Sequence, residues 1–152
     1  MKSVEFTVLK GFCDNEAYTR KVLPYVKDKY FETSVGRAAF SLCSGYFAEY
    51  GSCPTRQSLL VRLEQHEGAT EDEFREIGET FDLLIDSSEV GNVEFLTNTT
   101  ERWCQERAVY LALLDSIAIH DGQDKERTRD AIPGLLTDRS EEHTSELQSL
   151  TN

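Results

Sequence analysis

Four cysteines are the residues with the clearest capacity for chemistry, because thiolates bind metal ions and form disulfides. They are Cys13, Cys43, Cys53 and Cys104, separated by 30, 10 and 51 residues. Zinc knuckles and dithiol redox motifs place their cysteines about two to four residues apart. The spacing therefore predicts reduced, semi-buried cysteines that pack as small hydrophobic residues.

Histidines and carboxylates offer a second route to metal chemistry, because helical bundles hold two-metal sites with Glu-x-x-His motifs. Neither His66 nor His120 has a glutamate three residues before it, so both are expected at the surface. The acidic cluster at residues 71–79 is typical of a solvated helix face, and its first members suit a helix start. We therefore expect no metal site.

Nucleotide and acyl-transfer chemistry would leave recognisable motifs. The chain has no Gly-Lys pair and hence no phosphate-binding P-loop, and it lacks the Gly-x-Ser-x-Gly and His-Glu-x-x-His patterns. Arg102, Trp103 and Arg107 could stack a nucleic-acid base, but Glu101 and Glu106 lie beside them. A packed tryptophan flanked by salt-bridged arginines is the preferred interpretation, and we expect no catalytic or cofactor-binding residues.

The net charge helps to distinguish a nucleic-acid-binding protein from one that binds other proteins. The 152 residues carry a net charge of −12, with the acids spread along the chain. Nucleic-acid binding requires clustered lysines and arginines, so we expect little direct DNA contact and favour protein partners. No apolar run approaches the roughly 18 residues of a membrane span, and the start lacks a secretory pattern. We expect a cytoplasmic protein.

Helical spacing of apolar residues runs through most of the chain and predicts an all-α fold. We expect a small head of about five or six helices in a domain over residues 1–120, with helix starts capped by Asn15, Thr55 and Thr70. The last of these helices, about 92–119, would be roughly 40 Å long and should project or pair with another helix. The expected core residues are Phe40, Leu60, Phe81 and Trp103.

The C-terminal part is expected to be incomplete. Residues 121–138 read as a charged loop followed by an apolar element from Ala131. Residues Arg139–Ser149 then read RSEEHTSELQS, which resembles the in-frame translation of a sequencing adapter. A translated adapter is not native protein and has no bearing on the fold. We therefore expect residues 139–152 to be non-native and the native sequence to be cut near Asp138.

An ordered series of sequence blocks resembles the N-terminal domain of DnaB-type replicative helicases, especially the helicase subunit of T-even-type phage primase–helicases. The resemblance covers nearly all of residues 8–138. It is carried by the order and spacing of eight blocks together: Asn15–Tyr25, Lys29–Glu32 with Phe40, Glu49–Thr55, Leu59–Glu64, Thr70–Glu73, Asp86–Glu89, Thr100–Ala108 and Ala131–Pro133.

The resemblance implies a helical head followed by a helical hairpin. Six copies would form a collar above six motor domains, and the primase would dock on that collar. ATP and Mg²⁺ would belong to the motor domain, which is missing here. The long helix would be the first arm of the hairpin, with a subunit interface at Tyr110, Leu114, Ile117 and Ile119. With its second arm cut, this chain would be monomeric or weakly self-associating.

Two other classes of function remain open from the residues. A stand-alone acidic helical adaptor, such as a phage regulator that binds a host protein, would share the helical pattern and the negative charge. A helical metal enzyme has no support from ligand spacing, and metal analysis of the purified protein would exclude it.

The gene sequence beyond Asp138 distinguishes the helicase interpretation from the adaptor interpretation. We expect the reading frame beyond Asp138 to encode a Walker loop within roughly the next hundred residues, because the motor domain binds nucleotide through that loop. Sequencing the source genome checks this, and an early stop codon would favour the adaptor.

Overall fold

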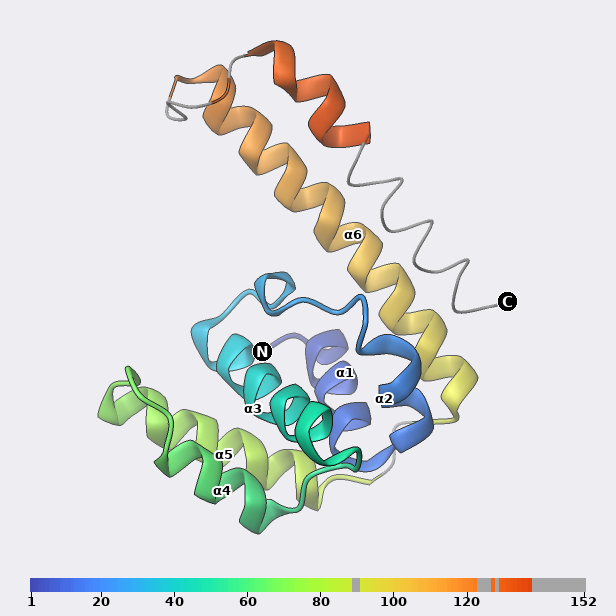
Figure 1. Cartoon of the computed structure of the whole chain (residues 1–152), viewed down its shortest axis with the longest axis vertical. Coiled ribbons are helices and arrows are strands. Elements are labelled where there is room, and N and C mark those ends of the chain that lie inside the picture. The colour runs from blue at the N-terminus through green and yellow to red at the C-terminus, as the bar shows by residue number, and fades with distance from the viewer. Residues whose placement is uncertain (89–90, 123–126, 128, 138–152) are drawn as a thin grey trace. The chain divides into compact units, whose positions relative to one another are not determined.

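The computed structural model describes residues 1–88, 91–122, 127 and 129–137 (Figure 1). Within these residues every regular element is a helix, which confirms the predicted all-α class. Residues 132–137 are also helical. The other elements are α1 (Ser3–Asp14), α2 (Glu16–Val22), η1 (Asp28–Tyr30), α3 (Ser34–Tyr50), α4 (Arg56–Glu64), α5 (Glu71–Asp86), α6 (Val93–His120) and η2 (Arg129–Ala131).

The chain forms two compact units, Met1–Thr100 and Glu101–Asn152. The division between them lies inside α6, whereas the boundary predicted from the sequence lies after this helix, at residue 120. The predicted boundaries at 120 and 138 stay predictions. The adapter-like segment at residues 139–152, together with Asp138, lies outside the described residues.

Local capping explains where the head helices begin. The Asn15 side chain accepts a hydrogen bond from the Tyr18 backbone N–H at 3.0 Å, and the Thr55 hydroxyl accepts one from the Ser58 N–H at 3.2 Å. Thr70 forms a reciprocal capping box at the start of α5. All three predicted caps are confirmed, and each is worth about 1 kcal/mol.

The same local chemistry ends the helices. Pro24 cannot donate a backbone hydrogen bond, and α2 ends at Val22, two residues before it. Gly51 ends α3 in the left-handed conformation, with φ of 70°, and donates its N–H to the Phe47 carbonyl. Only glycine adopts this conformation without strain.

The core of the first unit lies where α3 packs against α1, α4 and α5 (Figure 1). Its centre is aromatic. The Phe12 ring meets the Phe40 ring edge-on at 5.4 Å, and the Phe40 ring stacks on Phe31 at 5.3 Å. Tyr18 approaches α1 at Gly11, where a Cβ atom would overlap the tyrosine ring.

Of the four predicted core residues, Phe40, Phe81 and Trp103 are buried. Leu60 is only partly buried, so its assignment to the core was wrong. Leu59 and Leu63 are the leucines that α4 buries. They are four residues apart and share one helix face, from which Leu60 is turned away.

Phe81 and Leu83 provide a matched pair for testing the core. Phe81 is fully buried, whereas Leu83, two residues later on α5, is 64% exposed. We expect Phe81→Ala to lower the free energy of unfolding by about 3–5 kcal/mol, because the mutation leaves a cavity. Leu83→Ala should change it by no more than about 0.5 kcal/mol. Urea denaturation of both variants measures this, and equal losses would contradict the core assignment.

Candidate functional site

Helix α6 presents an apolar face to solvent. Besides Phe95 near its start, this helix has five large side chains that are between 44% and 56% exposed. They lie along one side of the helix, because pairs three or four residues apart connect all of them. We call this set the α6 apolar face: Val109, Tyr110, Leu113, Leu114 and Ile117.

The predicted interface residues divide between two faces of α6. Tyr110, Leu114 and Ile117 lie together on the α6 apolar face, whereas Ile119 is buried, with 3% of its surface exposed. Ile119 is nine residues beyond Tyr110, or about two and a half turns, so it points the opposite way. Ala112 is also buried, on the Ile119 side of the helix.

Two members of the α6 apolar face, Val109 and Leu113, were not among the predicted interface residues. The helical period could have identified them. Leu113 is three residues after Tyr110, and Val109, Leu113 and Ile117 are spaced four residues apart. The apolar composition of the helix indicates an apolar stripe, but it does not show which side of that stripe stays exposed.

Arg107 lies beside this face. Its guanidinium sits over the Tyr110 ring, 4.8 Å from the ring centroid, an arrangement worth about 0.5–1 kcal/mol at an exposed site. Trp103 is 5% exposed, which confirms the interpretation of a packed tryptophan. Buried in this way, Trp103 does not offer a free ring surface on which a base could stack.

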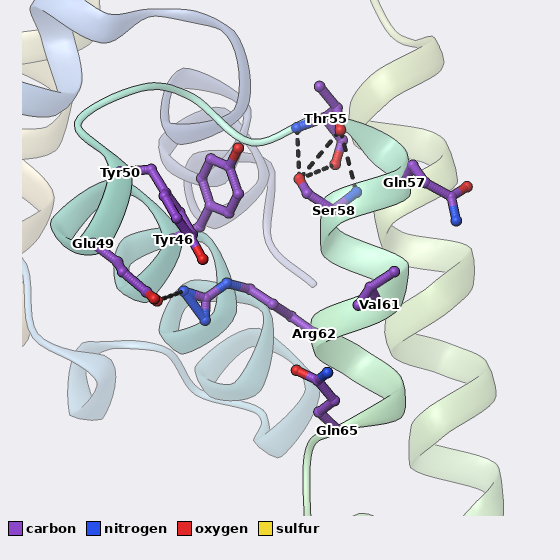
Figure 2. Close-up of a pocket in the computed structure, with 9 residues that line it drawn as sticks. All are labelled: Tyr46, Glu49, Tyr50, Thr55, Gln57, Ser58, Val61, Arg62 and Gln65. Carbon is purple, nitrogen blue, oxygen red and sulfur yellow. Dashed lines mark hydrogen bonds and ion pairs between the residues drawn. The ribbon is translucent and has the colours of Figure 1, made fainter.

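A second surface feature is the groove between α3 and α4 in the first unit (Figure 2). It has a volume of about 530 Å³. Tyr46 and Tyr50 from α3 line one side of the groove, and Arg62 reaches toward them from α4, as Figure 2 shows. Val61 also lines the groove from α4. The remaining lining residues are polar: Glu49, Thr55, Gln57, Ser58 and Gln65.

Arg62 connects the two sides of this groove. It donates a hydrogen bond from Nη2 to Glu49 Oε2 at 2.6 Å, and its guanidinium lies 5.6 Å and 5.9 Å from the Tyr46 and Tyr50 ring centroids. A hydrogen bond to Glu49 and the charge of that carboxylate raise the pKa of Tyr50. The Arg62 guanidinium is therefore already paired with Glu49. This pairing makes the groove a contact that braces α3 against α4, and it leaves little charge for binding an anion.

A metal site among the described residues would need several ligand side chains close together. Among those residues, no group of three or more His, Cys, Asp or Glu side chains could hold a metal ion. His66 and His120 are exposed, as predicted, and four of the five acids at 71–79 are exposed as well. The absence of cofactors stays a prediction.

None of the four cysteines is part of a disulfide, and their burial fits the packed thiols predicted from their spacing. Cys13, Cys43 and Cys104 are buried, and Cys53 is partly buried. Within the same described residues, none of the helices is both long enough and apolar enough to cross a membrane.

Comparison with known proteins gives one informative relative. No protein-family model matches the chain. The chain is 32% identical over 112 residues to a DnaB-like replicative helicase of Enterobacteria phage T4. The match covers 74% of this chain but 23% of the helicase, so the chain spans about a quarter of its relative's length. These findings support the predicted N-terminal domain of a DnaB-type helicase.

The Arg62 brace can be tested against a surface ion pair. Only 24% of the Arg62 side chain is exposed, whereas the Arg75 side chain, paired with Asp72, is 64% exposed. We expect Arg62→Ala to lower the free energy of unfolding by about 1–2 kcal/mol, because an ion pair and ring contacts are lost together. Arg75→Ala should cost less than about 0.5 kcal/mol. Equal effects in urea denaturation would show that Arg62 does not brace the helices.

Proposed function

Because the chain is related to the DnaB-type replicative helicases, we propose that it is the non-catalytic N-terminal collar domain of a hexameric replicative DNA helicase. In this function the domain assembles the subunits and docks the primase during DNA replication. ATP hydrolysis with Mg²⁺ would take place in a separate motor domain of the parent helicase, in the host cytoplasm.

The α6 apolar face is the observation that supports an assembly function. Fully burying a valine, leucine or isoleucine side chain stabilises a protein by about 1.5–3 kcal/mol. Each member of the face is about half exposed, so a partner that covers it would recover roughly 1 kcal/mol per side chain. A row of such side chains on one helix is typical of a surface that binds another protein.

The spacing of the face fits a second helix. Tyr110, Leu113, Leu114 and Ile117 follow the i, i+3, i+4, i+7 pattern by which helices pack side by side. In a symmetric oligomer the same surface on each subunit can meet its own copy. The hairpin pairing implied by the helicase resemblance uses this same part of the chain.

The charges of the head support protein partners in preference to DNA. Residues 1–100 contain ten basic and seventeen acidic residues. Most of the basic side chains are already paired within the head: Lys2 with Glu32, Lys10 with Asp14, Arg20 with Glu16, Arg56 with Asp82, Arg62 with Glu49 and Arg75 with Asp72. Few cations remain to neutralise phosphates, whereas a basic segment of a primase would find complementary charge.

Leu114 is the position at which to test the assembly function. In the full-length helicase, we expect Leu114→Asp to reduce the hexamer fraction at micromolar concentration by at least about tenfold, because a desolvated charge at a packed interface costs more than 1.4 kcal/mol. The head should stay folded, since Leu114 is 44% exposed. Light scattering measures assembly, and circular dichroism measures folding.

Leu83→Asp provides the matched control, because it introduces the same charge at a leucine that is 64% exposed on α5. This variant should assemble normally. If Leu114→Asp leaves the hexamer unchanged, the interface does not include the α6 apolar face. An assembly loss of equal size in both variants would indicate a general effect of added negative charge.

A further inference from the structure

Two cysteines that are far apart in the sequence meet in the core of the head. Cys13 lies on α1 and Cys43 on α3, and their sulfur atoms are 3.8 Å apart. Both thiols are buried, with 5% and 0% of each residue exposed. A separation of 30 residues gives no sign of this contact in the sequence.

The surrounding packing holds the two sulfurs in register. Helices α1 and α3 pack directly against each other. Phe12, next to Cys13, meets Phe40, which is one helical turn before Cys43, with the rings edge-on at 5.4 Å. A disulfide requires a sulfur–sulfur distance of about 2.05 Å. The sulfurs must therefore approach each other by about 1.8 Å for the bond to form.

We propose that Cys13 and Cys43 form an oxidisable dithiol, a covalent modification site that links α1 to α3 inside the head. Oxidation removes one hydrogen from each thiol and joins the two sulfurs. The two electrons and two protons pass to a small oxidant, either a low-molecular-weight disulfide, which becomes two thiols, or an azo compound such as diamide, which becomes its hydrazine. The site does not depend on the helicase function.

The surroundings make oxidation of the pair slow at neutral pH. A hydrogen bond with Cys13, together with burial, raises the pKa of Cys43 well above its ordinary value. Burial also raises the pKa of Cys53 to about 11, so this neighbouring thiol is also protonated at neutral pH. Because the thiolate is the reacting form, the link should form slowly at pH 7 and faster as the pH rises.

The link would strengthen the head. A disulfide restricts the unfolded chain, and the segment from Cys13 to Cys43 is long enough for a substantial effect. Oxidation should therefore raise the melting temperature by about 5 °C or more if the bond forms without strain. Reduction with a dithiol should restore the original value, since the exchange is reversible.

Peptide mapping of the folded 152-residue chain tests the site directly. The chain is treated with diamide at pH 8, blocked with an alkylating reagent and digested with trypsin without reduction. We expect residues 11–20 to be joined to residues 38–56 through Cys13 and Cys43. The second peptide also contains Cys53, so fragmentation must locate the bond. Thiol counting in denaturant should find two free thiols after oxidation and four before it.

Variants of the other two cysteines are the controls. Cys53→Ala and Cys104→Ala should keep the link, whereas Cys13→Ala and Cys43→Ala should abolish it. Circular dichroism verifies that each variant is folded, and the wild-type map does not depend on any of them. A bond that uses Cys53 would overturn the proposal. Four free thiols after native oxidation, when the same oxidant links the urea-unfolded chain, would overturn it as well.

Discussion

The close approach of α1 and α3 is the constraint on which the head depends. Phe12 and Phe40 meet edge-on across this contact, and Gly11 leaves the space that Tyr18 needs beside α1. Phe12 is fully buried, so any shift of the two helices would open a void in a close-packed interior. The positions of α2, α4 and α5 follow from this contact, because each packs directly on α1 or α3.

Several buried polar side chains of this core form hydrogen bonds to distant parts of the chain. Lys10 donates from Nζ to the Leu84 carbonyl at 2.6 Å, and Glu5 accepts a hydrogen bond from the Glu32 backbone N–H at 2.7 Å. The Tyr18 and Thr100 hydroxyl oxygens are 2.6 Å apart. A buried charge without a partner would be strongly destabilising. These contacts therefore fix the register of α1 against elements that lie much later in the chain.

The surfaces of the head and of α6 differ in chemical character. The head has an acidic surface whose cations are largely paired, and this favours protein partners over phosphates. Helix α6 instead exposes apolar side chains in a single row. In the proposed function, the first surface would dock a second protein and the α6 apolar face would pair subunits.

The sequence by itself determined the helical class, the three caps and the length of α6. These features depend on residues within one or two helical turns, so local periodicity and hydrogen bonding suffice to predict them. The tertiary structure alone decided that Leu59 and Leu63, not Leu60, enter the core, and that Ile119 is buried while Tyr110 stays exposed. It also brought Cys13 and Cys43 together. These outcomes depend on which side of each helix meets a neighbour, and helix–helix packing between distant parts of the chain sets that choice.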